Sequence, residues 1–380
     1  MVLFLHSRYR VTGGEERVVE NLMWLVREYL GEQTQLLERD SARLSHARAA
    51  LGLLRGGLGG EEVQSAVRGR GAGIVHAHNL QPTLGWRALQ AAKLAGARVV
   101  LHLHQYRLVC ATGVCFTRGA PCTRCHGRNT LPGVALRCRG PLGESLAYGA
   151  GLALWQRRIV EEADAVLVPS EFALVRLREL GAPIPWARTH VLRPPLRAFA
   201  NSSSAAHGRY ALAVSRLAQE KGIDVALDAC ALAGVPLVIA GEGPQRPALE
   251  ARASAGGASV RFLGVKRESE LAELRAHAAV ALVPSRSENF PMAAAEAMAA
   301  GVPVVASRVG GLSELVDDDG LVAPGDPRQL AAAIERRFGD AAAGERGLER
   351  VRSLCAPEAV ARALADVYSR ALRSDADTSP

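Results

Sequence analysis

Residues 284–306 read PSRSENFPMAAAEAMAAGVPVVA, and this stretch decides the fold. Pro291 suits the first position of a helix, the alanine-rich run after it has high helix propensity, and Gly301 suits the helix end. Apolar runs at 280–283 and 302–306 predict strands on both sides of the helix. A strand, a loop, a helix and a second strand in this order make one unit of a parallel α/β sheet.

Two glutamates lie in this unit, separated by seven residues. Glu288 is on the loop at the carboxyl end of a strand, where open α/β sheets bind ligands. Glu296 is about two turns into the helix. The amides of Asn289 and Phe290 point to the same edge, at a helix N-terminus that favours phosphate. Carboxylates that can bind hydroxyls and amides that can bind a diphosphate together suit a nucleotide-sugar.

The stretch resembles the donor signature of the family-4 retaining glycosyltransferases, the group 1 type, which have the GT-B fold. The resemblance rests on the spacing of the two glutamates within Pro-Ser, Phe-Pro, Glu-Ala-Met-Ala and Gly-Val-Pro-Val-Val segments. It implies an α/β protein with two doubly wound, Rossmann-like domains that face each other across a cleft. The donor-binding residues that it implies here are Glu288, Asn289, Phe290, Pro291, Met292 and Glu296.

Short apolar runs alternate with helical stretches along the whole chain. They lie at 2–5, 35–37, 74–76, 99–103 and 165–168, and then at 210–214, 237–240, 260–263, 280–283 and 304–306. This alternation predicts parallel βαβ units in two doubly wound domains. A Pro-rich segment at 193–195 and a polar one at 201–204 set the boundary, giving domains at 1–195 and 196–356. The resemblance implies that a helix at about 357–373 crosses back to the first domain.

Composition and charge agree with an α/β enzyme of two domains. The chain has 380 residues, 48% hydrophobic and 22% charged, and its net charge of +8 comes almost wholly from arginine. A basic surface favours anionic nucleotides, anionic lipid head groups or nucleic acid, and an arginine bias of genomic origin is the alternative. No apolar run approaches the ~20 residues of a membrane span, and Met1–Leu5 is too short for a signal-peptide core. We expect a cytoplasmic protein, with peripheral contact at the inner face of the membrane left open.

Two glycine loops follow predicted strands. Gly13 and Gly14 come directly before a helix, so their amides can approach an anion closely, although a plain turn is the alternative. The sequence GGEERVV at 13–19 resembles the family's glycine loop, which faces the donor diphosphate. Gly241 and Gly243 lie in GEGP, which resembles the family's turn near the nucleotide. We expect that turn to shape the backbone and to take no part in the chemistry.

Two cations follow the first strand of the second domain. Arg216 and Lys221 lie in RLAQEKG at 216–222, which resembles the family's phosphate-binding loop. Cations there can stabilise a departing diphosphate as charge develops on it. The resemblance implies that both are catalytic, that Glu288 binds hydroxyls of the transferred sugar, and that Glu296 binds the ribose.

Four histidines close two predicted strands of the first domain. Alternation puts His76 and His78 on the same side of one strand, and His102 and His104 on the same side of the other. Structural hydrogen bonding is the ordinary role of such residues, and bound zinc is the alternative. The sequence HQYRLVC at 104–110 resembles a family subgroup in which this histidine faces the transferred sugar, so His104 is a catalytic candidate. Further acceptor-side candidates are Asn79 and Arg107.

A cysteine cluster lies in a Gly/Pro/Arg-rich segment of the first domain. Cys122 and Cys125 have the spacing of zinc ligands, with Cys110 and Cys138 as the third and fourth ligands of a structural zinc. A cytosolic context argues against disulfides, so free thiols are the alternative. In the subgroup that it resembles, this loop lies near the acceptor. Relatives more often read Pro-Asn-Gly after the first cysteine, where this chain has Ala-Thr-Gly.

These features predict a retaining transferase that moves a hexose-type sugar from a nucleotide-diphosphate donor, a UDP-sugar in preference to a GDP-sugar, to an acceptor hydroxyl. The acceptor is a glycan, a lipid-linked or a small molecule, in cell-surface glycan or natural-product glycoside biosynthesis. The family retains configuration by front-face displacement, which needs no protein nucleophile. Asp317–Asp319 reads as a turn, not an Asp-x-Asp metal motif, so no cofactor or metal is expected for catalysis. A nucleotide-sugar epimerase is the alternative, and nucleic-acid binding is not expected.

Overall fold

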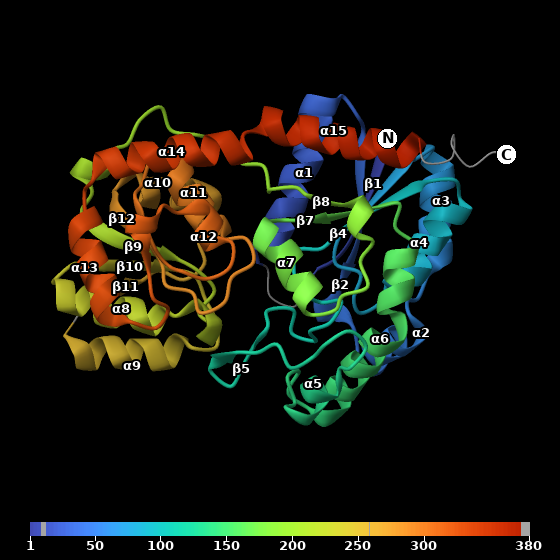
Figure 1. Ribbon diagram of the computed structural model, residues 1–380, viewed down its shortest axis with the longest axis horizontal. Helices are drawn as coiled ribbons and strands as arrows, with labels where there is room; N and C mark the ends of the chain where they lie inside the picture. The colour runs from blue at the N-terminus through green and yellow to red at the C-terminus, as the bar shows by residue number, and fades with distance from the viewer. Residues whose placement is uncertain (9–12, 258, 374–380) are drawn as a thin grey trace. The chain divides into compact units, whose positions relative to one another are not determined.

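The chain folds into two compact units, each with its own parallel sheet (Figure 1). The computed structural model describes residues 1–8, 13–257 and 259–373. The first unit comprises Met1–Thr117, Cys122–Pro195 and the chain from Pro357. The second comprises Arg118–Pro121 and Leu196–Ala356.

Parallel strands form the sheet of the first unit, in the order β2-β1-β3-β4-β7-β8. They are β1 (Val2–Arg8), β2 (Thr34–Asp40), β3 (Ile74–Ala77), β4 (Arg98–His102), β7 (Ala165–Val168) and β8 (Thr189–Val191). The helices are α1 (Gly14–Leu30), α2 (His46–Arg55), α3 (Gly60–Arg70), α4 (Gly85–Leu94), α5 (Leu131–Ala135), α6 (Leu142–Glu161), α7 (Glu171–Glu179) and α15 (Pro357–Arg373). Two short strands, β5 (Phe116–Thr117) and β6 (Ala120–Pro121), lie between β4 and α5. Strands β3 and β7 are buried throughout, as expected of parallel strands covered on both faces.

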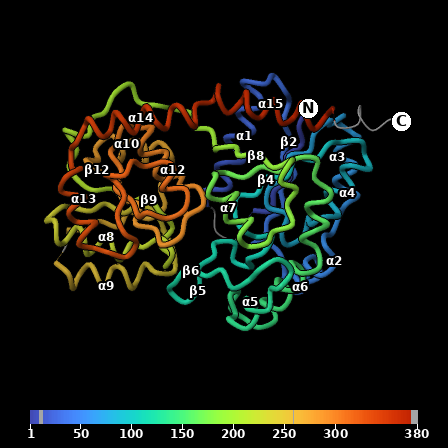
Figure 2. The backbone as a smooth tube through the Cα atoms, viewed as in Figure 1, coloured from blue at the N-terminus to red at the C-terminus, as the bar shows by residue number. Residues whose placement is uncertain are grey.

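The C-terminal helix α15 belongs to the first unit and lies beside α1 (Figure 2). Its apolar face buries Val360, Leu364 and Val367. The hydroxyl of Tyr368 lies 2.7 Å from Nδ1 of His76 on β3. The last helix of the chain is therefore tied to a central strand of the first sheet.

The second unit has a parallel sheet in the order β11-β10-β9-β12-β13-β14. Its strands are β9 (Tyr210–Val214), β10 (Leu237–Ala240), β11 (Val260–Phe262), β12 (Ala278–Val283), β13 (Val304–Ser307) and β14 (Leu321–Val322). Its helices are α8 (Ile223–Ala233), α9 (Arg246–Gly256), α10 (Glu268–Ala276), α11 (Met292–Ala299), α12 (Leu312–Leu315), α13 (Pro327–Arg337) and α14 (Ala341–Cys355). All six residues of β12 are buried, which matches its continuous apolar sequence.

Each sheet has a point where the strand order reverses. The chain passes from β1 outward to β2 and then returns to β3 on the other side of β1, and it passes from β9 to β10 and later to β12 on the other side of β9. Open α/β sheets bind ligands at the carboxyl ends of the strands at such points. Two edges of the protein are therefore candidates for a site, one in each unit.

The two parallel sheets confirm the predicted α/β class. The outermost strands β8 and β14 were not predicted, because each is only two or three residues long and has little room for a periodic pattern. Within the described ranges 1–8, 13–257 and 259–373, no helix has the length and apolar character that crossing a membrane requires.

Candidate functional site

Lys221 and Glu288 form an ion pair at the carboxyl edge of the second sheet. Lys221 ends the 3-10 helix that follows β9, and Glu288 lies on the loop after β12, the neighbour of β9. Nζ of Lys221 is 2.7 Å from Oε2 of Glu288, which also accepts a hydrogen bond from the Ser285 hydroxyl at 3.1 Å. Because both side chains are largely buried, solvent screens their attraction only weakly.

Arg216 lies on the same edge and pairs with Glu220. The arginine side chain is 47% exposed, whereas that of Glu220 is 11% exposed. The Glu220 carbonyl oxygen accepts a hydrogen bond from the amide of Arg286 at 2.7 Å, which ties the loop after β9 to the loop after β12. Both predicted phosphate cations therefore stand on one edge of the sheet, each with a carboxylate partner.

Glu296 is held by an arginine that sequence reasoning missed. Its Oε2 accepts from the guanidinium of Arg275 at 2.5 Å, and the same guanidinium donates to Glu268 at 2.6 Å. The side chains of Arg275 and Glu296 are nearly buried. Arg275 lies in the last turn of α10 and sits in no motif, so only the structure identifies it as the group that orients Glu296.

Gly310 and Gly311 support the Glu288 loop and were also missed. Both follow β13, and Gly310 has a φ of +58°. A side chain at Gly310 would overlap the carbonyl oxygen of Glu288, and one at Gly311 would overlap that of Asn289. The sequence signal that could have identified them is a pair of glycines shortly after a strand, the same signal that identified Gly13 and Gly14.

The predicted turn after β10 lies against the loop after β9. A side chain at Gly241 would overlap the carbonyl oxygen of Ser215, and one at Gly243 would overlap that of Leu217. The backbone therefore needs glycine at both positions so that the two loops can meet. This agrees with a role in backbone shape.

The other predicted donor residues lead into helix α11. The Asn289 amide lies 3.4 Å from Oε1 of Glu288, and the Met292 amide donates to the Phe290 carbonyl oxygen at 3.1 Å. Pro291 is the residue before the helix, and Met292 begins it. The loop and the helix start thus stand beside the Lys221 ion pair.

The predicted glycine loop of the first unit caps helix α1. The amide of Gly13 donates to Oε2 of Glu16 at 2.7 Å, and the helix begins at Gly14. The residues before Gly13, at positions 9–12, lie outside the described ranges. In this structure the amide that was predicted to face a diphosphate is bonded to a carboxylate of its own helix.

Four histidines form two hydrogen-bonded pairs at the carboxyl edge of the first sheet. Nε2 of His76 is 3.3 Å from Nδ1 of His102, and Nδ1 of His78 is 2.7 Å from Nε2 of His104. The ring centres of the pairs are 5.4 and 5.0 Å apart, with interplanar angles of 12° and 10°. The rings of each pair therefore meet edge to edge. The pairs stack on each other, because His76 packs on His78 and His102 on His104.

His76, His78 and His102 are buried, His104 is partly exposed, and all four imidazoles are neutral. Burial, with a smaller contribution from the charge of His104, lowers the pKa of His76 to about 3. Burial also holds the pKa of His78, His102 and His104 well below the usual value, with neighbouring imidazoles adding to the effect. Each bonded pair needs one N–H donor and one bare nitrogen acceptor, which neutral rings supply.

Among the described residues, one group of side chains has a spacing that could suit a metal ion. It consists of His76, His78 and His102, which each place one ring nitrogen within 4.8 Å of the others. Zinc ligands direct their lone pairs at a common point. Here the bonded nitrogens of His76 and His102 point at each other. Hydrogen bonding accounts for this geometry better than metal binding does.

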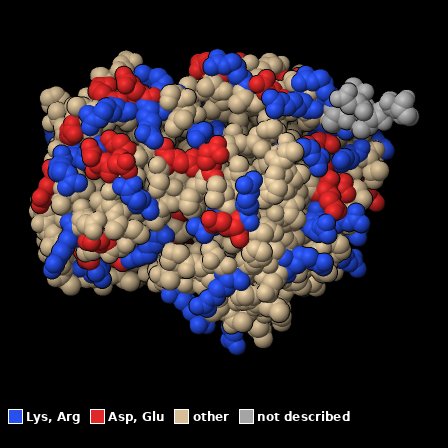
Figure 3. Space-filling model, viewed as in Figure 1, with Lys and Arg blue, Asp and Glu red and all other residues tan. Residues whose placement is uncertain are grey.

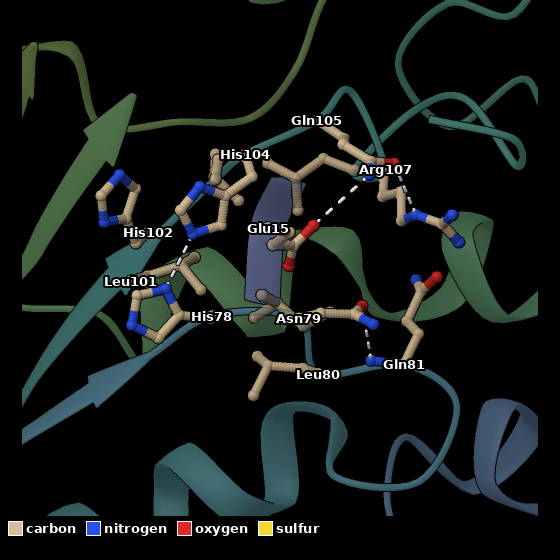
Figure 4. Close-up of a pocket in the computed structure, with 13 residues that line it drawn as sticks. Glu15, His78, Asn79, Leu80, Gln81, Leu101, His102, His104, Gln105 and Arg107 are labelled. Atoms are coloured by element: carbon tan, nitrogen blue, oxygen red, sulfur yellow. Dashed lines mark hydrogen bonds between the residues drawn. The ribbon is translucent and has the colours of Figure 1, made fainter. Parts of the chain in front are cut away.

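A pocket of about 410 Å³ opens beside these histidines in the first unit (Figure 4). Nε of Arg107 donates to Oε1 of Gln105 at 3.0 Å, and Nε2 of Gln105 donates to Oε2 of Glu15 at 3.4 Å. The predicted candidates His104 and Asn79 line the pocket together with Arg107. Glu15 and Gln105 were missed, although Glu15 lies directly after the predicted glycine loop.

The zinc site predicted from Cys110, Cys122, Cys125 and Cys138 is not supported. In the part of the chain that the structure describes, no three of these sulfur atoms lie within 4.8 Å of one another. Zinc–sulfur bonds of about 2.3 Å require closer spacing. Sγ of Cys110 lies 3.2 Å from the Thr112 hydroxyl, a contact that a free thiol makes. Cysteine spacing in the sequence does not reveal where a loop of this length folds its thiols.

Comparison with known proteins gives a consistent family. Residues 208–340 match the family model described as glycosyl transferases group 1, and residues 29–195 match the one described as a glycosyl transferase 4-like domain. The chain is 37% identical over 183 residues to a glycogen synthase of Mycobacterium tuberculosis, covering 44% of each chain. It is 42% identical over 126 residues to a GDP-mannose-dependent alpha-(1-6)-phosphatidylinositol dimannoside mannosyltransferase of the same species, covering 31% of this chain and 32% of that protein. The matches thus span less than half the length of these relatives.

The fold has close counterparts among solved structures. The Anabaena protein HepE, solved in complex with UDP, aligns with a TM-score of 0.65 at 18% identity, over 97% of this chain and 99% of that one. This similarity establishes the GT-B architecture of two Rossmann-like domains. Since the two family models together cover most of the chain and the donor-side motifs occupy the expected strand ends, the chain belongs to the group 1, family-4 glycosyltransferases.

Proposed function

We propose that the protein is a retaining glycosyltransferase that moves a hexose-type sugar from a UDP-sugar to an acceptor hydroxyl. The observation that carries the proposal is the partly buried ion pair of Lys221 and Glu288 at the switch point of the second sheet. A cation for a diphosphate and a carboxylate for sugar hydroxyls stand there side by side. HepE has been solved with UDP-glucose, which supports a donor of this class.

The donor would bind on the second unit, where each cation already has a carboxylate partner. A diphosphate brings negative charge that competes with Glu288 for Lys221 and with Glu220 for Arg216. As the sugar leaves, charge on the diphosphate increases, so both cations stabilise the transition state more than the bound donor. Glu288, released in part from Lys221, then binds hydroxyls of the sugar.

Glu296 would bind the ribose hydroxyls of the donor. Its carboxylate has two oxygens, and the ion pair with Arg275 uses Oε2. An ionised carboxylate accepts several hydrogen bonds, so it can bind Arg275 and a ribose hydroxyl together. Arg275 fixes the direction of this carboxylate.

The acceptor would bind on the first unit, in the pocket beside His104. Polar side chains among its lining, such as Asn79 and Gln105, can bind hydroxyls, and neutral His104 can exchange a hydrogen bond with the sugar or the acceptor. The mycobacterial relatives are named for a polysaccharide and for a lipid-linked mannoside. We therefore propose a saccharide acceptor, free or lipid-linked, as in the synthesis of cell-surface glycans.

A two-stage experiment tests the proposal. A panel of UDP- and GDP-sugars is first screened by thermal shift, because a ligand that binds only the folded protein raises its melting temperature. The donors that shift it are then incubated with oligosaccharide and glycolipid acceptors, and the anomeric configuration of the product is read by NMR. Shift by a GDP-sugar alone would overturn the UDP assignment, an inverted product would overturn retention, and a free sugar epimer formed without acceptor would identify an epimerase.

A further inference from the structure

One stretch of the chain carries all of its excess positive charge. Residues 63–143 contain ten arginines and one lysine but no aspartate or glutamate, whereas the rest of the chain has a slight excess of acids. A bias of genomic origin would spread arginine along the chain without removing acids from one stretch. The positive charge of this segment therefore suggests that it binds an anionic partner.

The later part of this stretch is fixed along helix α6. The carbonyl oxygen of Ala153 accepts from Nε of Arg128 at 2.9 Å, and that of Gly149 accepts from the hydroxyl of Thr130 at 2.8 Å. Arg139 pairs with Glu144 in the first turn of α6 at 2.9 Å. The basic segment and the helix thus form one surface of the first unit.

Exposed leucines lie on this surface. Leu131 of α5 is 74% exposed, and on α6 Leu142, Leu146 and Leu154 are 49%, 50% and 48% exposed. Leu142 and Leu146 are four residues apart, so they share a helix face. Helix α5 packs beside α6 (Figure 1). We call these four leucines, with the exposed Arg124, Arg128 and Arg137, the α5–α6 face.

The charge of this face is left uncompensated. Arg124, Arg128 and Arg137 are exposed, and within the described residues no acid pairs with them. Glu144, the first acid after the basic stretch, is already bonded to Arg139. On the side of the molecule seen in Figure 3, the surface over α5 is blue and tan without red. An anion of some size is the natural complement.

We propose that the α5–α6 face docks the protein on the surface of an anionic lipid membrane. Arginines pair with lipid phosphates there, while the neighbouring leucines enter the boundary between head groups and acyl chains. A soluble polyanion would draw on the arginines but would give no reason for four leucines to stay in water. Single-stranded nucleic acid would call for exposed aromatic rings, and this face presents leucines instead.

The test uses the full chain and two kinds of vesicle. Co-sedimentation is measured with phosphatidylcholine vesicles and with vesicles that also contain phosphatidylglycerol, at low and at high salt. Binding is expected only with phosphatidylglycerol and is expected to weaken with salt, because ions screen the attraction. Each arginine near an anionic surface strengthens binding about fivefold, so Arg124→Gln, Arg128→Gln and Arg137→Gln together should weaken it about a hundredfold.

Matched control variants distinguish binding through this face from nonspecific electrostatic or hydrophobic binding elsewhere on the protein. Leu142→Glu with Leu146→Glu should abolish binding, while Leu232→Glu, at an equally exposed leucine of the second unit, should leave it unchanged. Arg328→Gln, Arg336→Gln and Arg362→Gln remove the same charge at exposed positions elsewhere and should have little effect. Melting temperatures confirm that every variant is folded.

Several outcomes would overturn the proposal. These are absence of vesicle binding, equal binding to neutral vesicles, equal loss in the control variants, or tighter binding of a polyanionic glycan or an oligonucleotide than of the vesicles. Membrane docking does not require sugar transfer, so the vesicle assay and the transfer assay test the two proposals independently. A protein that transfers sugar but ignores vesicles refutes the docking face alone, and one that binds vesicles but transfers no sugar refutes the proposed function alone.

Discussion

The carboxyl edges of the two sheets have the same topology, but one carries paired charges and the other carries neutral side chains. At the edge of the second sheet, cations and carboxylates are paired, as Lys221 with Glu288 and Arg275 with Glu296. At the edge of the first sheet, the imidazoles of His78 and His104 are neutral and bonded to each other. Strand order alone therefore does not determine what an edge can bind.

The difference suggests that the two edges bind different chemical groups. Paired charges can rearrange around a diphosphate, which needs cations where negative charge develops. Neutral donors and acceptors suit hydroxyl groups, which bring no charge to balance. We therefore expect damage to the charged edge to affect the rate and nucleotide binding, and a change of pH to act first on the histidine edge.

The largest expected effect is on the charged edge. Lys221→Ala should lower the transfer rate by ~10²–10³, because it removes a cation that stabilises the departing diphosphate. Binding of the nucleoside, which lacks phosphate, should change little. Initial rates and nucleoside calorimetry measure both. Lys93→Ala, which removes a lysine paired with Asp164 in the first unit, is the control, and a Lys221→Ala rate within a few-fold of the wild type would refute the catalytic role.

The two glutamates should respond differently. Glu296→Gln should weaken the donor and free UDP alike, by about tenfold, because both carry ribose and uniform binding is lost. Glu288→Gln should spare or strengthen free UDP, because it frees Lys221 from its carboxylate partner, while lowering turnover and discrimination among sugars. Calorimetry with UDP beside turnover with the donor distinguishes them, and equal loss of UDP affinity in both variants would show that the assignment is wrong.

The sequence predicted the charged edge better than the neutral one. Arg216, Lys221 and Glu288 each follow a predicted strand, so local pattern was enough to place each of them at the carboxyl edge of the sheet, but it did not predict the ion pair of Lys221 with Glu288. Arg275 was missed because its link to Glu296 is a tertiary contact between helices α10 and α11.

At the neutral edge, strand alternation placed the four histidines correctly on shared sides. It could not show that His76 would bond across strands to His102, or that Tyr368 from the far end of the chain would reach His76. The zinc site predicted from the cysteines is not supported, for the same reason. Ligand spacing in a long loop says little about the final positions of its sulfur atoms.

A change of pH should act on the neutral edge. The pKa of His76 is about 3 in the folded chain and about 6.5 unfolded, so below pH 6.5 the unfolded state binds the extra proton and stability falls as pH falls. Each such histidine should cost ~1.4 kcal/mol per pH unit in that window. Urea unfolding from pH 8 to pH 5 measures the slope. His76→Gln should flatten it, whereas His46→Gln, at an exposed histidine, should not.

The smallest expected effect is that of chelation on the charged edge. The one Asp-x-Asp sequence within the described residues is Asp317–Asp319. Its first carboxylate, on Asp317, already pairs with Arg337 at 2.7 Å, and Asp318 between the two pairs with Arg308 at 2.6 Å. On the proposed function, Arg216 and Lys221 would neutralise the diphosphate in place of a metal ion. Transfer should therefore proceed at an unchanged rate after treatment with EDTA, measured against a parallel sample with added magnesium. If activity depended on magnesium or manganese, Arg216 and Lys221 would not suffice to neutralise the diphosphate. The proposal that this edge works without a metal ion would then be refuted.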